Sequence, residues 1–173
     1  MSSFNIIKGS CIHQNVDAIV NAANDMLLNG GGVCGAIFTK AGWRELADAC
    51  SKYKTPLNDG DAVITPAFNI TNTKAIIHAV GPDFNRRTAS IDNLFNAYYN
   101  SLKVLMDNEL HSISFPLISS GLFGGTLDNP VRVSTRNCID AYNKFIKDYP
   151  DYNIEVLLCA FNDNEYNEAL KEV

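Results

Sequence analysis

The 173-residue chain has no apolar run long enough to cross a membrane, since a transmembrane helix needs about 20 predominantly apolar residues. Its first residues, Met-Ser-Ser-Phe-Asn, lack the basic segment and the following apolar stretch of a secretory signal peptide. These absences argue against a membrane protein and against a secreted one. We therefore expect a cytoplasmic protein without membrane contact.

The sequence also lacks the cysteine pairs that form disulfides or bind zinc. The five cysteines are scattered, odd in number and free of any C-x-x-C pair. This pattern favours neither a disulfide framework nor a zinc site, so we expect a reducing compartment and no bound metal. Cys50, Cys138 and Cys159 are interpreted as small core residues.

Positive charge is in the minority, with 14 Lys and Arg against 19 Asp and Glu, which gives a net charge of -5. Nonspecific nucleic-acid-binding proteins are usually basic, so the balance argues against that class. A small anionic ligand is still possible because backbone amides can hold a diphosphate without Lys or Arg. The length and the 46% hydrophobic content fit one ordinary globular domain over residues 1–173.

Apolar runs alternate with segments of helical periodicity along the chain. We predict strands over residues 4–8, 16–21, 62–65, 74–80, 113–118 and 154–159, and helices over residues 33–41, 43–51, 90–108, 130–148 and 163–173. Alternating strands and helices predict a three-layer α/β/α domain with a mixed, largely parallel central sheet.

Several residues carry specific expectations within this pattern. Lys74–Val80 is nearly continuously apolar, which is typical of a strand buried on both faces. His78 in this strand is interpreted as a hydrogen-bonded core histidine, and Trp43 as a core anchor. Ser90 and Asn129 are expected to cap the two longest helices.

The most informative stretch is Asn21–Gly35, which contains two asparagines and three consecutive glycines between a strand and a helix. Glycines let backbone N–H groups approach a ligand, and a helix N-terminus carries partial positive charge, so the loop suits a diphosphate. A tight turn is the alternative, and neither G-x-x-x-x-G-K-[ST] nor G-x-G-x-x-G is present. Ser119–Gly125 and Ala160–Asn164 follow two other strands. Ligands bind outside the carboxyl ends of such strands, so we expect the three loops on one rim.

Four segments resemble the macro domain family of ADP-ribose-binding modules. They are residues 16–24, 30–37, 77–82 and 116–124, and they occur in the family's order. The resemblance covers the chain from Phe4 to about Leu170. It implies a deep cleft for ADP-ribose, ADP-ribosylated proteins as partners, no cofactor and a monomer.

The resemblance also implies roles for residues. Gly31, Gly32 and Val33 would hold one side of the diphosphate and the backbone of Ser119–Phe123 the other, while Asn24 would bind the distal ribose. The implied ligand contacts are Ser10, Cys11, Ala22, Asn24, Gly31, Gly32, Val33, Ser119, Ser120, Gly121, Leu122, Phe123 and Phe161. The implied catalytic set is Asn24, Gly32, Cys34 and Phe123. Phe161 would pack on adenine, with a core cap on the last helix as the alternative.

Two residues depart from the family pattern. Ser10 stands where many macro domains have an aspartate that accepts from the adenine amine, so it brings a hydroxyl and no carboxylate. Cys34 stands where the MacroD-type hydrolases have an aspartate for the attacking water. Cysteine there resembles the macro domains of alphaviruses, which are similar in activity, and a viral chain would act in the host cytoplasm. A position near a helix N-terminus would lower the thiol pKa, but we favour Cys34 as a pocket wall, with water attacking.

Three functions follow from these residues. The first is a hydrolase that releases mono-ADP-ribose from acidic side chains of proteins, and also deacetylates O-acetyl-ADP-ribose. The second is a reader that binds ADP-ribose without turnover, which Ser10 and Cys34 favour and Asn24 opposes. The third and weakest, RNA or poly(A) binding through the adenosine site, is opposed by the acidic charge.

Overall fold

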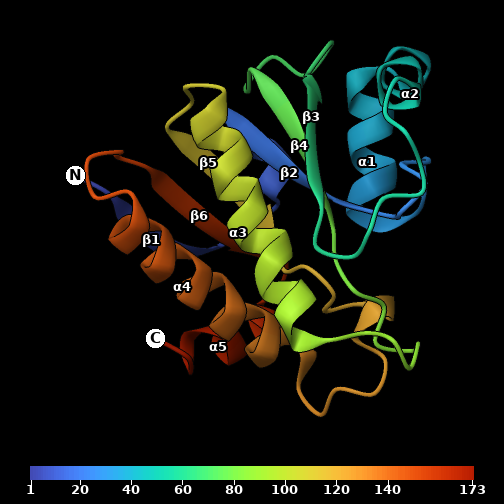
Figure 1. Cartoon of the computed structure of the whole chain (residues 1–173). Helices are drawn as coiled ribbons and strands as arrows, with labels where there is room; N and C mark the ends of the chain where they lie inside the picture. The colour runs from blue at the N-terminus through green and yellow to red at the C-terminus, as the bar shows by residue number, and fades with distance from the viewer.

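A computed structural model describes all residues of the chain, 1–173. Six strands form one sheet in the order β1-β6-β5-β2-β4-β3 (Figure 1). Their bounds are β1 Ser3–Lys8, β2 Ala18–Ala23, β3 Ala62–Pro66, β4 Ala75–Val80, β5 Ser112–Pro116 and β6 Glu155–Ala160. All neighbouring pairs are parallel except β3 and β4, which are antiparallel. The predicted mixed, largely parallel sheet is confirmed.

Helices cover both faces of this sheet, as Figure 1 shows with α3 and α4 in front. The helices are α1 Gly32–Ala41, α2 Trp43–Ser51, α3 Ile91–Asp107, α4 Pro130–Asp148 and α5 Asp163–Leu170, with short 3-10 helices at Cys11–His13 and Leu122–Gly124. Successive strand residues enter different cores. Ile19 and Ile76 pack with α1 and α2, whereas Val20 and Ile77 pack with α3 and α4. The three-layer α/β/α architecture is therefore confirmed.

Local sequence signals explain the longest helices. The Ser90 hydroxyl accepts a hydrogen bond from Asn93 N and begins α3, and the Asn129 side chain accepts from Arg132 N at the start of α4. These caps satisfy N–H groups that have no partner within the helix. Every residue of β4 is buried, as its apolar run predicts. None of the helices has the length and apolar composition of a transmembrane span.

The expectation for Trp43 is wrong. Its side chain is 56% exposed, at the first position of α2 directly after Gly42. The apolar side of α2 is instead formed by Leu46 and Cys50, which lie on the buried face. The Arg44 guanidinium lies 5.6 Å from the centre of the indole ring and covers part of it.

The parallel arrangement brings several loops to one edge of the sheet. The carboxyl ends of β1, β6, β5, β2 and β4 all point to this edge, because these strands run in one direction. Antiparallel β3 begins there, so the preceding residues 57–61 lie at the same edge. Backbone hydrogen bonds join the loops, from Gly9 N to Ala160 O at 2.8 Å and from Leu57 N to Asp25 O at 2.8 Å. The three loops expected on one rim follow β2, β5 and β6, which are adjacent and parallel, so the loops lie at the same edge of the sheet.

Candidate functional site

The glycine loop ends at the N-terminus of α1. Gly31 is the N-cap, and Gly32 begins the helix with a φ of 58°, a left-handed conformation that glycine adopts without steric cost. Both residues are exposed, and no atom lies within 4 Å of the position that a Cβ would take on either. The first turn of α1 therefore presents unpaired N–H groups and positive partial charge to open space. An anion fits this position.

Asn24 follows the end of β2 and shapes the first part of the same loop. Its Nδ2 donates to Leu28 O at 2.8 Å, and its Oδ1 accepts from Met26 N at 3.2 Å and Leu28 N at 3.0 Å. Between Asn24 and Leu28, Leu27 has a φ of 55° and its side chain is buried. Because Nδ2 carries two hydrogens, one of them remains for another acceptor.

A second loop of small residues follows β5. The Ser119 hydroxyl donates to Pro82 O and the Ser120 hydroxyl to Leu117 O, both at 2.7 Å, so both hydroxyls are turned into the protein. Gly121 and Leu122 are exposed, and Phe123 is half-buried. The part of this loop that remains for a ligand is therefore its backbone and the Phe123 ring.

Cys34 lies in the first turn of α1 and is buried, with 6% of its surface exposed. Burial raises the pKa of the thiol, although a hydrogen bond from the Asn21 side chain opposes the change. Its Sγ contacts Leu28 O at 3.5 Å as a donor. The expectation of a lowered thiol pKa at the helix N-terminus is therefore wrong, because desolvation of the thiolate outweighs the hydrogen bonds that favour it. The Cys34 thiol is therefore buried and protonated.

The residues expected near adenine follow β1 and β6, which are paired in parallel. Ser10 is half-buried and its hydroxyl caps no helix. The Cys11 thiol is buried and donates to Val20 O at 3.6 Å, so only the backbone of Cys11 can face a ligand. Phe161 is 72% exposed, which shows that it is not a core cap on α5. Its aromatic face is open to a flat partner.

The family model described as Macro domain matches residues 20–134, more than half of the chain. The chain belongs to the macro domain family.

Relatives and solved structures agree with this membership. A protein of Salmonella typhimurium named O-acetyl-ADP-ribose deacetylase is 38% identical over 83% of this chain and 82% of its own length. The Oceanobacillus iheyensis macrodomain with ADP is similar with a TM-score of 0.85 and 32% identity, covering 96% of this chain and 87% of that one. The Trypanosoma brucei macrodomain in complex with ADP-ribose has a TM-score of 0.82 and 30% identity, covering 96% and 67%.

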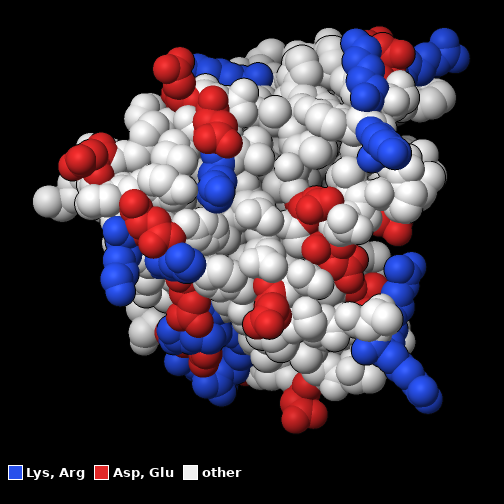
Figure 2. All heavy atoms as spheres, viewed as in Figure 1, with Lys and Arg blue, Asp and Glu red and all other residues white.

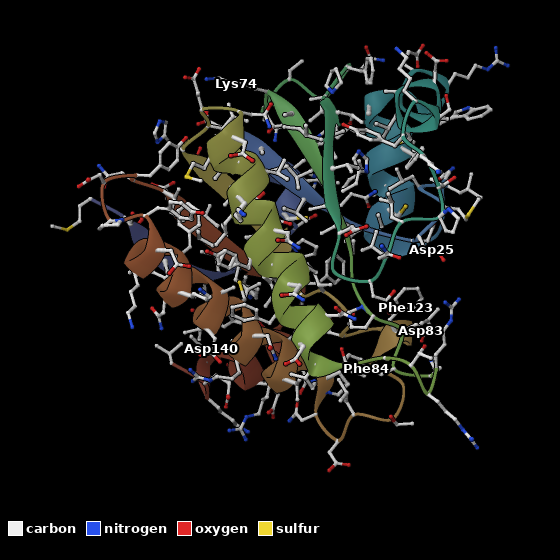
Figure 3. The ribbon with its side chains drawn as sticks, in the orientation of Figure 1. Asp25, Lys74, Asp83, Phe84, Phe123 and Asp140 are labelled. Carbon is white, nitrogen blue, oxygen red and sulfur yellow. The ribbon has the colours of Figure 1, made fainter.

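One loop of this macro domain has no counterpart in the sequence prediction. Residues 82–89 follow β4 and hold the second loop from outside, since Phe84 N donates to Phe123 O at 2.8 Å and Asn85 Nδ2 to Leu122 O at 2.7 Å. Figure 3 shows Asp83 and Phe84 beside Phe123. The signal that points to this loop is its position after the parallel strand β4, which ends at Gly81-Pro82.

Carboxyl groups at this edge were also not anticipated. Burial raises the pKa of Asp59, the nearby Arg86 guanidinium lowers it, and the charges of Asp25 and Asp83 raise it. These side chains therefore lie close enough to influence one another across three different loops. The edge around the glycine loop carries acidic groups as well as N–H donors.

No group of three or more His, Cys, Asp or Glu side chains is arranged to hold a metal ion. A cavity of about 400 Å³ lies between α2 and β3, lined by residues that include Tyr53, Thr65 and Phe68. Thr65 is near the carboxyl end of antiparallel β3, which points away from the glycine loop. This cavity is therefore separate from the site formed by the loops.

Behind the glycine loop, a buried polar network confirms the expectation for His78. Its Nδ1 is 3.0 Å from Asn21 Nδ2, and its Nε2 is 2.9 Å from Thr65 Oγ1. Burial lowers the pKa of His78 to about 4, because desolvation disfavours the imidazolium. His78 is therefore a neutral hydrogen-bonded residue of the core and is remote from solvent.

We expect the free energy of unfolding to fall by about 2 kcal/mol between pH 7 and pH 5 because of His78. The unfolded chain, with a pKa of 6.5, binds a proton there that the folded protein, with a pKa of about 4, does not bind. The contribution is present in full above pH 6.5 and is lost as the pH falls toward 4. Urea unfolding at pH 7, 6 and 5 measures it.

Two variants test the assignment to His78. His78→Gln should flatten the pH dependence of the free energy of unfolding, whereas His13→Gln, at an exposed position, should leave it unchanged. Should His78→Gln fail to fold, the imidazole NMR signals of His78 in the wild type give the same information. Titration of those signals with a midpoint near 6.5 would contradict the assignment.

Proposed function

We propose that this macro domain binds ADP-ribose between its two loops and hydrolyses the ester that joins ADP-ribose to an acidic side chain of a protein. The observation that carries the proposal is the open space in front of α1, where Gly31 and Gly32 are exposed, at the same edge of the sheet as the Ser119–Phe123 loop that follows the neighbouring strand β5. The relatives named O-acetyl-ADP-ribose deacetylase and the neighbours solved with ADP and ADP-ribose support it. O-acetyl-ADP-ribose is a second substrate in this proposal, because it contains the same kind of ester.

In this mechanism the protein supplies positioning and electrostatic stabilisation. The N–H groups of the α1 first turn and of the second loop hold the diphosphate. The free hydrogen on Asn24 Nδ2 binds a hydroxyl of the distal ribose, and Phe123 packs beside that ribose. Water attacks the ester carbonyl, and a phosphate oxygen of the substrate accepts a proton from that water. The bond between the carbonyl carbon and the ribose oxygen then breaks, and the phosphate passes the proton to the departing ribose oxygen. The carboxylic acid left on the protein loses its own proton to solvent. The products are ADP-ribose and the free carboxylate.

The alternative is a reader without turnover, favoured by the absence of a carboxylate at Cys34 and Ser10. Incubation with an ADP-ribosyltransferase that has modified its own acidic residues separates the two functions. Loss of the mark supports the enzyme, whereas binding of ADP-ribose with no loss supports the reader. Both the hydrolase and the reader must bind ADP-ribose, which calorimetry with ADP-ribose, NAD and ATP tests. A protein without preference for ADP-ribose would contradict both functions.

Nucleic-acid binding has little support. Acidic and basic side chains are interspersed over the face that carries α3 and α4, without a continuous basic surface (Figure 2). Binding through phosphate contacts would weaken steeply as salt concentration rises, whereas ADP-ribose binding through neutral amides should change little.

We expect Cys34→Ala to retain hydrolysis within about threefold of the wild-type rate, because a buried thiol with a raised pKa is a poor nucleophile. Single-turnover hydrolysis of O-acetyl-ADP-ribose measures this, and Cys50→Ala, at a second buried cysteine, is the control for packing loss. A Cys34→Ala protein that binds ADP-ribose normally but is inactive would show that the thiol takes part in the chemistry.

A further inference from the structure

The cavity between α2 and β3 has no role in the proposed function. We infer that this cavity binds an arginine side chain of a partner protein, with the guanidinium in contact with two carboxylates and two aromatic rings. The inference does not depend on the proposed function, because the cavity is separate from the glycine loop. Its volume of about 400 Å³ lies within the range of roughly 300–1,000 Å³ that is typical of ligand pockets.

One wall of the cavity is a face of α2. It is formed by Glu45, Asp48 and Ala49 and by Lys52, the C-cap of the helix. Residues three or four apart lie on the same side of a helix, so the two carboxylates are neighbours in this wall. Both acidic residues are exposed, and the ion pairs of the protein are all formed by other residues. The wall therefore presents two carboxylates that have no cationic partner.

Two aromatic rings form other parts of the lining. The Tyr53 hydroxyl donates to Ile64 O, which holds the ring of Tyr53 beside β3. Phe68 is 41% exposed and has a left-handed backbone with a φ of 49°. The residue after it is tied to the end of α1, since Asn69 N donates to Ala41 O at 3.1 Å. Both rings are therefore held at the cavity by hydrogen bonds of other groups, and that of Phe68 remains partly open.

The chemistry of this lining fits a guanidinium better than an ammonium. A guanidinium is planar and donates from five N–H groups in a fixed fork, so its edge can bond to carboxylates while its face packs on an aromatic ring. An ammonium is a compact and strongly hydrated charge without such a face. Ala49 and Ile64 provide apolar surface for the methylene stem of arginine. Because Glu45 and Asp48 outnumber Lys52, the lining is also net negative.

A side chain fits this position better than an added strand. β3 is the last strand in the sheet order and has a free edge. A strand added there would find Ile64 O already bonded to Tyr53 and no N–H on Pro66. The nearby guanidinium of Arg44 lies 5.6 Å from the centre of the Trp43 ring, and neither residue lines the cavity. The arginine that fits the cavity must therefore come from another protein.

NMR titration of the full chain with the blocked peptide acetyl-Gly-Arg-Gly-amide tests this inference. The backbone amide signals of residues that line the cavity should shift, with millimolar affinity for a single side chain. The corresponding lysine peptide should bind about fivefold more weakly, because it loses the stacked face and part of the hydrogen bonding. The corresponding glutamine peptide, which has no charge, should cause no shifts.

Variants of the lining should change the affinity in opposite directions. The double variant Glu45→Gln, Asp48→Asn should weaken binding of the arginine peptide about tenfold, the loss expected for a charge-assisted hydrogen bond. Phe68→Leu, which keeps an apolar side chain but removes the aromatic face, should weaken it about threefold. Lys52→Gln should strengthen it about threefold, because a like charge at an exposed site is removed.

A matched control removes two exposed carboxylates elsewhere. The double variant Asp151→Asn, Glu155→Gln changes the charge by the same amount at and before β6, which is not adjacent to β3, and should bind the arginine peptide as the wild type does. All these substitutions are at exposed positions, so the variants should fold, and thermal unfolding checks this. Their affinity for ADP-ribose should equal that of the wild type.

Three results would overturn the inference. They are an absence of shifts at the cavity, a lysine or glutamine peptide that binds as tightly as the arginine peptide, and weaker binding in Lys52→Gln, which would indicate an anionic ligand. ADP-ribose binding is measured in a separate titration, so each of these results leaves the proposed function in place.

Discussion

Asn24→Ala should lower the rate of ester hydrolysis by about 100-fold, the loss that misplacement of a bound substrate by about 1 Å can cause. The substitution removes the donor proposed for the distal ribose and all three hydrogen bonds that the side chain makes within its own loop. Backbone groups in this exposed loop can bond to water instead, so stability should change little. Single-turnover hydrolysis and thermal unfolding measure the two effects separately.

Two further variants separate the contact with ribose from the shape of the loop. Asn24→Asp keeps acceptors for Met26 N and Leu28 N but has no hydrogen to donate. If ribose binding depends on the donor, Asn24→Asp should be about as inactive as Asn24→Ala. Asn143→Ala, at an exposed position of α4, is the control and should be fully active. Wild-type turnover in Asn24→Ala would mean that the proposed role of this residue is wrong.

The fold could be predicted from the sequence wherever one periodicity dominated a segment. Ala75–Val80 is apolar except for His78 and forms a strand buried on both faces, and the caps Ser90 and Asn129 begin their helices as expected. Trp43 was misassigned because the burial of a single large residue at a helix start depends on which tertiary neighbours reach it. A propensity or a periodicity contains no such information.

The candidate site was predictable in part for a similar reason. The glycine loop and the Ser119–Gly125 loop have ligand-like compositions and follow parallel strands, so their residues could be named in advance. The support from Phe84 and the carboxyl group of Asp59 could not, because they enter through contacts between loops and through the antiparallel strand β3. The thiol pKa of Cys34 depends on a balance between burial and nearby hydrogen bonds, which only the folded position of the side chain decides.

The contact between the second loop and residues 82–89 depends on Gly125. This residue has a φ of 48°, and a Cβ on it would lie 2.4 Å from Phe84 C and 2.5 Å from Asn85 N. These are backbone atoms, and Phe84 is held in place from both sides, since its N–H donates to Phe123 O and its carbonyl accepts from Thr126 N. Neither segment can move without breaking those hydrogen bonds.

Gly125→Ala should therefore lower the free energy of unfolding by about 2–4 kcal/mol, through steric overlap and a left-handed backbone that alanine disfavours. It should also weaken ADP-ribose binding at least tenfold, because the displaced loop no longer presents its backbone to the diphosphate. Urea unfolding and calorimetry measure the two losses. Gly31→Ala is the matched control for stability, since Gly31 has an extended backbone and no atom within 4 Å of an added Cβ. Wild-type stability and wild-type affinity for ADP-ribose in Gly125→Ala would contradict this argument. They would mean that the Ser119–Gly125 loop is not held against residues 82–89 by a close approach at Gly125.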